Sequence, residues 1–116
     1  MRLDTARFAD VVVLSPAGRV DHGTAEQLKT ALAPHLARCA KGQDHVVLDL
    51  AGVDYISSAG LRVMLTLAKK TRDTGGALAL CGMGDLVREV FGLAGFLPLF
   101  AIEPGRDAAV ARVAGR

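Results

Sequence analysis

The stretch His45–Leu50, "HVVLDL", restricts the possible folds of this chain more than any other feature of its sequence. It is short and continuously apolar, which is typical of a strand that is covered on both faces. The sequence predicts two further strands of β character, Val11–Pro16 and Ala77–Cys81, and the first of these pairs with a strand at Arg2–Phe8 through a turn near Ala9–Asp10. A sheet built from such strands needs helices to cover it.

Two longer stretches between these strands have the apolar spacing of amphipathic helices. Thr24 followed by Gln27 is the sequence pattern of a capping box, so the first helix is expected to begin there and to run to about Ala40. Pro34 falls opposite the apolar stripe, and we expect it to bend this helix without breaking it. The stripe consists of Ala25, Leu28, Leu32, Leu36 and Cys39.

The second helix is expected to begin near Ser58 and to end at Gly75–Gly76. One broad arc of this helix is apolar and the opposite arc is polar, with Val63 on the boundary between them. The apolar arc holds Leu61, Met64, Leu65, Leu67 and Ala68, and the polar arc holds Arg62, Thr66, Lys69, Lys70 and Asp73.

The remainder of the chain predicts a short helix around Leu86–Phe91 and a last, frayed helix at Asp107–Val113. Between them, "FLPLF" at Phe96–Phe100 is expected to form an edge strand, because Pro98 cannot donate a hydrogen bond to a neighbouring strand. Strands that alternate with helices in this way predict an α/β fold with crossover connections. We expect one domain that spans residues 1–116.

Composition excludes several classes of function. The net charge of +2, the absence of Trp and the single Tyr argue against a nucleic-acid-binding protein. No apolar run approaches the roughly 20 residues of a membrane span, and no signal peptide is recognisable, so a cytoplasmic protein without membrane insertion is expected. Cys39 and Cys81 lie far apart without metal-type spacing and are expected to be buried free thiols.

The candidate chemistry lies in two segments that lead from strands into helices. Gly18–Gly23 is expected to be a loop that carries Asp21 and His22, and Tyr55–Gly60 carries the adjacent hydroxyls of Ser57 and Ser58. In α/β sheets such segments tend to open on the same edge, where ligands and partners bind. We therefore expect these four side chains to form one patch.

Ser58 has two interpretations. Its hydroxyl can cap the second helix, which contributes about 1 kcal/mol, or it can accept a phosphate that the helix dipole and free N–H groups would hold without unfolding the domain. Ala59 and Gly60 leave the approach to this hydroxyl open. Asp21 is either a solvated loop carboxylate or, if it faces Ser58, a group that orients the hydroxyl during transfer and repels the phosphate afterwards.

Enzymatic sites are not evident. "ISSAG" is not the G-x-S-x-G elbow of a serine hydrolase, and "CGMGDLV" has Val87 where a dinucleotide-binding motif needs its third glycine. No P-loop and no grouping of His, Cys and carboxylates with metal spacing is present in the sequence. We expect a protein that is not an enzyme, without cofactor or metal, although a small enzyme with Ser58 as nucleophile is a competing hypothesis.

Three blocks of the sequence, "GRVDHGTAEQLKTAL", "HVVLDLAGVDYISSAGLRVMLTLAKK" and "GALALCGMGDLVREVFGLAGFLPLF", resemble the STAS domain family. The resemblance covers nearly the whole chain in order, and it is closest to the stand-alone anti-sigma factor antagonists of bacteria. It implies a mixed β-sheet with about four helices packed mainly on one side.

The resemblance also implies a partner-switching regulator. Unphosphorylated members bind an anti-sigma factor that is also a GHKL-type serine kinase, and this binding frees the sigma factor. The kinase phosphorylates a serine at the start of the second helix, which releases the antagonist, and a PP2C-type phosphatase restores it. The phosphorylated serine of the family falls on Ser58, and its acidic loop residue falls on Asp21.

One departure from the family leaves the modified residue open. Many members have Asp immediately before the phosphorylated serine, and this chain has Ser57, which is a second candidate acceptor. Phosphorylation is predicted at Ser58 and less strongly at Ser57. The predicted partner-binding surface consists of Asp21, His22, Ser57, Ser58, Gly60, Arg62, Val63 and Thr66.

The main alternative is a STAS subunit of another cytosolic complex that phosphorylation does not regulate. A stressosome-type scaffold and the accessory subunit of a lipid-transporting ABC complex are examples. The oligomeric state, a monomer or a weak homodimer, is left open by the sequence.

Overall fold

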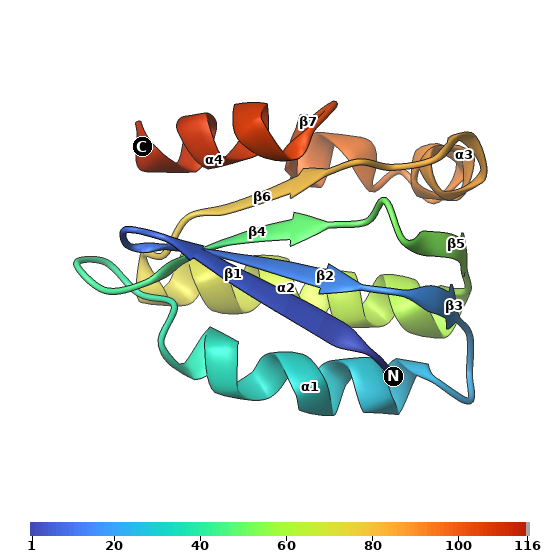
Figure 1. The fold of residues 1–116 in the computed structure, drawn as a ribbon. Coiled ribbons are helices and arrows are strands. Elements are labelled where there is room, and N and C mark those ends of the chain that lie inside the picture. The colour runs from blue at the N-terminus through green and yellow to red at the C-terminus, as the bar shows by residue number, and fades with distance from the viewer. Residues whose placement is uncertain (116) are drawn as a thin grey trace.

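A five-stranded mixed sheet forms the centre of the computed structural model, which describes residues 1–115 (Figure 1). The strand order is β1-β2-β4-β6-β7, and β3 pairs with β5 in a separate two-stranded sheet. The strands are β1 (Leu3–Phe8), β2 (Val11–Pro16), β3 (Gly18–Val20), β4 (His45–Asp49), β5 (Val53–Ile56), β6 (Leu78–Cys81) and β7 (Ala101–Glu103). The helices are α1 (Ala25–Ala37), α2 (Ser58–Thr74), α3 (Asp85–Leu93) and α4 (Arg106–Ala114), and Leu97–Leu99 is the short 3-10 helix η1.

The central sheet combines one hairpin with parallel crossovers. β1 and β2 are antiparallel, whereas β2, β4, β6 and β7 run parallel to one another. Parallel neighbours need a crossover connection, which α1 provides between β2 and β4, α2 between β4 and β6, and α3 with η1 between β6 and β7, whereas α4 follows the last strand. α1 and α2 lie side by side, and in Figure 1 α1 is below the sheet and α2 behind β1 and β2, whereas α4 lies above. The predicted α/β class, mixed sheet and preference of the helices for one side are confirmed, with α4 as the helix on the opposite face.

The paired side chains of β2 and β4 show why these strands are apolar throughout. Val12 and Leu48 belong to the core beneath α1 and α2, whereas Val13 and Val47 belong to the core beneath α4. Side chains alternate between the faces of a strand, so a strand between two helical layers needs apolar residues at every position. His45 is also buried in β4, and its Nδ1 accepts a hydrogen bond of 2.9 Å from the backbone N–H of Ala77.

The predicted α1 is confirmed in its stripe, in its start after Thr24 and in its passage through Pro34, but not in its C-terminal end. The helix stops at Ala37, and Cys39 already belongs to a bridge with Asp44. The predicted capping box is wrong, because Thr24 makes no side-chain cap and instead donates from Oγ1 to the carbonyl of Arg19 at 2.7 Å. All five residues of the predicted apolar stripe are buried.

Two segments differ from the sequence prediction. Gly18–Val20, expected within a loop, forms the short strand β3. The predicted edge strand at Phe96–Phe100 is wrong: its centre is the 3-10 helix η1, and the edge strand β7 follows it. Pro98 lies in the first turn of η1, where its missing N–H costs little. Phe96 and Phe100 pack edge-on against Phe91, with ring centroids 6.4 and 5.8 Å from it, so an aromatic cluster takes the side chains that would have lined a strand.

The last helix is longer and more firmly packed than expected. α4 covers Arg106–Ala114, and its Ala109 and Val113 are 0% and 3% exposed, so the helix packs on the sheet rather than fraying. Cys39 and Cys81 are buried free thiols, as predicted. No helix within residues 1–115 combines the length and the apolar character that crossing a bilayer requires.

Candidate functional site

The pairing of β3 with β5 brings the two predicted loops together. Val20 is the last residue of β3 and Ile56 the last residue of β5, and these two residues are partners in a parallel ladder. The backbone N–H of Ser57 donates to the carbonyl of Val20 at 2.8 Å, which extends the pairing into the loops. The chain then turns from Asp21 into α1 and from Ser57 into α2, so the expected common edge is confirmed for these segments.

The two serines at the start of α2 have different surroundings. Ser57 is the N-cap residue, is 7% exposed, and accepts a hydrogen bond of 3.3 Å at Oγ from the backbone N–H of Gly60. Ser58 is the first residue of the helix, and its side chain is exposed. The capping role that the sequence allowed for Ser58 therefore belongs to Ser57. Ser58 retains a hydroxyl that is accessible to solvent.

Gly60 lets the first turn of α2 lie directly on the paired strands. A Cβ atom at this position would be 2.7 Å from Cγ1 of Val20 and 2.7 Å from Cγ1 of Ile56. Separations this short between carbon atoms are strongly repulsive. Gly60 is buried, so its place in the predicted partner surface is beneath the exposed residues rather than among them.

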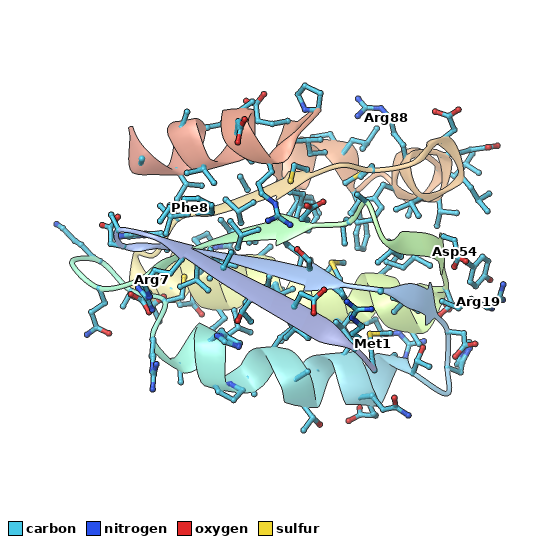
Figure 2. The ribbon with its side chains drawn as sticks, viewed as in Figure 1. Met1, Arg7, Phe8, Arg19, Asp54 and Arg88 are labelled. Atoms are coloured by element: carbon cyan, nitrogen blue, oxygen red, sulfur yellow. The ribbon has the colours of Figure 1, made fainter. Side chains whose placement is uncertain are left out.

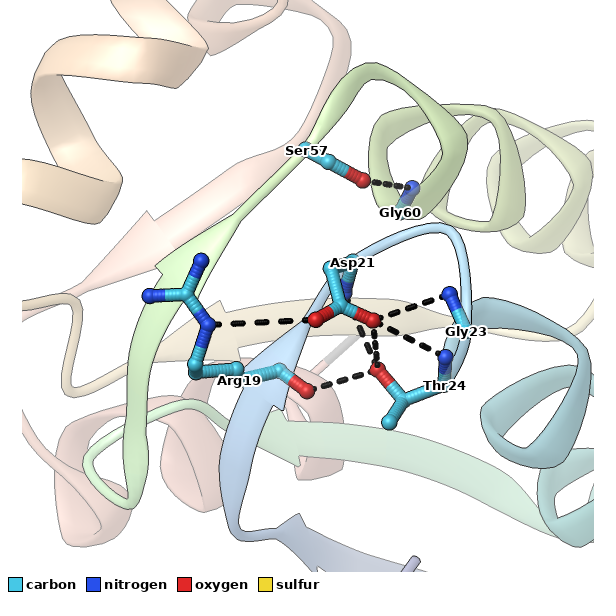
Figure 3. A network of polar contacts seen from close by, with 6 residues as sticks. All are labelled: Arg19, Asp21, Gly23, Thr24, Ser57 and Gly60. Carbon is cyan, nitrogen blue, oxygen red and sulfur yellow. Dashed lines mark hydrogen bonds and ion pairs between the residues drawn. The ribbon is translucent and has the colours of Figure 1, made fainter.

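Asp21 organises its own loop (Figure 3). Its Oδ1 accepts hydrogen bonds from the backbone N–H groups of Gly23 and Thr24, at 2.9 and 3.1 Å, and from the Thr24 hydroxyl at 3.2 Å. The hydrogen bond from the Thr24 N–H contributes most to holding the pKa of Asp21 below its usual value. Within residues 1–115 the carboxylate makes no hydrogen bond to Ser57 or Ser58, so its contacts support the loop rather than an orienting role.

Arg19 borders this loop on the side of β5. Its Nε lies 3.8 Å from Oδ2 of Asp21, and its guanidinium carbon lies 4.2 Å from the centre of the Tyr55 ring. Figure 2 places Arg19 and Asp54 together at the β3–β5 end of the molecule, away from Arg7 at the turn of the β1–β2 hairpin. The guanidinium of Arg19 is thus held in place by a carboxylate and an aromatic ring.

A groove of about 350 Å³ lies between α1 and α2, next to the serines. Four of its lining residues belong to the predicted partner surface, namely His22, Arg62, Val63 and Thr66, and the groove therefore joins the His22 loop to the outer side of α2. Ala25, Glu26, Lys29 and Ala59 complete the lining.

Sequence reasoning missed Glu26 and Lys29 because it considered the polar arc of α2 alone. Both residues lie outside the apolar stripe of α1, and their position on the groove follows from the packing of α1 beside α2. Residues 1–115 contain no group of three or more His, Cys, Asp or Glu side chains that could hold a metal ion.

Comparison with known proteins identifies relatives of the whole chain. The family model of the STAS domain matches residues 2–109. BtrV of Bordetella bronchiseptica, whose name describes it as a candidate anti-sigma factor antagonist, is 44% identical over 111 residues, which cover 96% of this chain and 93% of BtrV.

Solved structures agree with this result. A candidate anti-sigma factor antagonist from Thermotoga maritima superposes with a TM-score of 0.86 and 25% identity, over 97% of this chain and 94% of that one. The anti-sigma factor antagonist SpoIIAA shares the fold at lower identity. Its unphosphorylated form gives a TM-score of 0.78 at 20% identity, over 99% of this chain and 98% of that one. Its phosphorylated form gives a TM-score of 0.68 at 18% identity, over 97% of this chain and 99% of that one.

Proposed function

The chain belongs to the STAS domain family, and we propose that it is a partner-switching anti-sigma factor antagonist that is controlled by phosphorylation of Ser58. In its unphosphorylated form it binds an anti-sigma factor that is also a GHKL-type serine kinase, and the sigma factor is released. Transfer of the terminal phosphate of ATP to Ser58 ends this binding, and a PP2C-type phosphatase restores it. The protein is a cytoplasmic binding module and catalyses no reaction of its own.

The different surroundings of the two serines carry this proposal. A kinase needs an accessible hydroxyl, and Ser58 is exposed at the first position of α2. Ser57 is 7% exposed, and its oxygen already accepts a hydrogen bond from Gly60. Modification of Ser57 would have to remove the cap of α2, whereas modification of Ser58 leaves every hydrogen bond of the helix start in place. Ser58 is therefore the favoured acceptor.

The surface next to Ser58 suits the partner. His22, Arg62 and Thr66 are exposed around the groove between α1 and α2, and Val63 forms part of its floor. A phosphate carries a charge of about −1.5 to −2 at neutral pH. Placed at the edge of this groove, it would change the charge and the shape of the docking surface while the core beneath remained unaltered. Such a change releases a partner without unfolding the domain.

The known relatives support the same reading. BtrV carries the name of a candidate anti-sigma factor antagonist. SpoIIAA has solved structures in an unphosphorylated and in a phosphorylated form. Both forms of SpoIIAA have the fold of this chain. A fold that persists in both states is what a switch acting at the surface requires.

Incubation of the purified protein with candidate GHKL-type kinases and ATP, followed by mass spectrometry, tests the assignment. We expect one phosphate on Ser58 and none on Ser57. Ser58→Ala should fold like the parent and retain kinase binding, whereas Ser58→Asp should fold like the parent and bind more weakly. Equal binding of the two variants, or a phosphate found on Ser57, would contradict the proposal.

A further inference from the structure

Arg62 lies one helical turn after Ser58 on α2, and both side chains are exposed. Residues four apart on a helix share one face, with Cβ atoms roughly 5–6 Å apart. The Cα–Cβ bonds of a helix tilt toward its amino end, so a long side chain at the later position leans toward the earlier one. The guanidinium of Arg62 is thus within reach of a group attached to the Ser58 oxygen.

Arg62 has no competing partner. Within residues 1–115 no carboxylate lies within 4.0 Å of its guanidinium, and the same holds for the ammonium of Lys29 across the groove. Most of the other described arginines differ in this respect. Arg2, Arg7, Arg19, Arg106 and Arg112 each form an ion pair.

Arg19 is the other cation close to the loops, and it is already engaged. Its guanidinium is held between Asp21 and the Tyr55 ring. To reach a phosphate on Ser58, it would have to leave both contacts. Arg62 would leave none, because among residues 1–115 its guanidinium makes no hydrogen bond or ion pair, and the Thr66 hydroxyl donates to its backbone carbonyl instead.

We infer that Arg62 binds the phosphate of phosphorylated Ser58 within the same chain, and that this ion pair withdraws Arg62 from the groove between α1 and α2. The inference rests on the proposed modification of Ser58. A guanidinium and a phosphate form charge-assisted hydrogen bonds that are stronger than those between neutral groups. The phosphate thereby acts as an internal competitor for the cation that the unphosphorylated protein presents to its partner.

The charges around the groove explain how this pairing would weaken the binding of a partner. The lining carries Lys29 and Arg62 as cations and Glu26 as the one carboxylate among residues 1–115. A phosphate of about −1.5 to −2 on Ser58, next to the lining residue Ala59, outweighs the net positive charge of this lining. An acidic group of the partner that pairs with Arg62 before modification is repelled afterwards.

A protein with phosphoserine placed at position 58 by chemical ligation tests the pairing without any kinase. The phosphorus NMR signal followed against pH gives the second pKa of the phosphate. A neighbouring cation lowers this pKa, and we expect Arg62→Gln to raise it by roughly 0.3 of a unit or more relative to the parent. Arg62→Lys should restore most of the difference, because it keeps the charge.

Two matched variants separate this pairing from general effects. Lys29→Gln removes a cation across the groove, and Arg72→Gln removes an exposed cation near the end of α2. Each should leave the phosphate pKa within roughly 0.1 of a unit of the parent, because salt screens the interaction of exposed charges that lie far apart. A phosphate pKa that is unchanged in Arg62→Gln, or changed equally in Lys29→Gln, would overturn the inference. Because the phosphate is installed by synthesis, this result is independent of whether a kinase modifies Ser58.

Discussion

The two faces of the central sheet are built from side chains of different size. Toward α1 and α2, the strands present residues such as Leu14, Leu48 and Leu80. Toward α4 they present smaller ones, among them Ala79 and Cys81. These small residues let α4 lie close to the sheet, where this one helix contacts β2, β4, β6 and β7. The larger core on the other face supports two long helices side by side, and the groove between them begins beside Ser58, at Ala59.

The faces also differ in how polar groups are used. On the α4 face, Arg106 donates from Nε and Nη2 to Oδ2 of Asp49, at 3.2 and 3.0 Å, and from Nη2 to the Ser15 hydroxyl at 2.9 Å. This network joins the start of α4 to β2 and β4. On the other face, the exposed cations Lys29 and Arg62 have no such partners among residues 1–115. Charge therefore serves stability on one face and is available for binding on the other.

The largest effect is expected from Gly60→Ala, which tests how closely α2 must approach the β3–β5 pair. The new methyl group would be 2.7 Å from Val20 and Ile56, and overpacking of this kind costs about 1–3 kcal/mol. Gly92→Ala in α3 is the matched control, since its Cβ would be 3.5 Å from the nearest atom, Leu97 Cδ1. We expect that control to gain about 0.5–1 kcal/mol from helix propensity. Urea denaturation of both variants measures the difference, and equal stabilities would refute the close-approach argument.

A smaller loss of stability is expected from removing the ion pair between Asp49 and Arg106, which joins α4 to the sheet. Asp49 has 13% of its side chain exposed, and Asp49→Asn should lower the free energy of unfolding by about 1–1.5 kcal/mol, because Asn keeps an oxygen acceptor for Arg106 but loses the charge that strengthens these hydrogen bonds. Asp4→Asn removes the exposed pair with Arg2, whose side chains are 64% and 76% exposed. That control should change stability by less than about 0.5 kcal/mol. If the two substitutions lower the free energy of unfolding equally in thermal or urea denaturation, the Asp49 network stabilises the fold no more than an exposed ion pair does.

The two serines provide the next comparison. Ser57→Ala removes the cap of α2 and should cost about 1 kcal/mol, whereas Ser58→Ala should change stability by less than about 0.5 kcal/mol. Their effects on phosphorylation should be the reverse, with Ser58→Ala abolishing it. Calorimetry together with a phosphorylation assay measures both. A larger stability loss for Ser58→Ala than for Ser57→Ala would show that the assignment of the cap to Ser57 is wrong.

A last effect, which is small at neutral pH and grows only in alkaline solution, concerns the α4 face. Burial is the largest cause that raises the pKa of the Cys81 thiol, from 9.0 to about 11. Between these values the unfolded chain releases this proton and the native protein keeps it, so the native state binds more protons and stability falls as pH rises through this window. Cys81→Ala should lessen that fall. Urea midpoints at pH 8, 9.5 and 10.5 measure it, and parallel curves for parent and variant would argue against a buried neutral thiol.

The strands β2, β4 and β6 and the bodies of α1 and α2 could be predicted from sequence because their patterns are local. A continuous apolar run or a helical stripe expresses burial within a few residues. β3 could not be predicted in this way. It is three residues long, and its pairing with β5 depends on a partner more than 30 residues away. At Phe96–Phe100 the apolar residues were recognised, but their packing against Phe91 required the tertiary structure.

The common edge of the candidate site was predictable from sequence, but the contacts of its members were not. The sequence placed Ser57, Ser58 and Asp21 at one edge, and the pairing of Val20 with Ile56 brings their segments together. A pattern cannot say which of two adjacent serines caps a helix, because helix boundaries shift by one or two residues. The contacts of Asp21 with its own loop were equally beyond reach, since they depend on the backbone conformation of Gly23 and Thr24.

If Ser58 is phosphorylated as proposed, the buried cap at Ser57 makes the selection of the acceptor a property of the native state. A ribosome-bound or denatured chain would offer both hydroxyls to a modifying enzyme, whereas the folded domain offers Ser58 and withholds its neighbour. Modification of Ser57 would therefore require that the start of α2 first unfold.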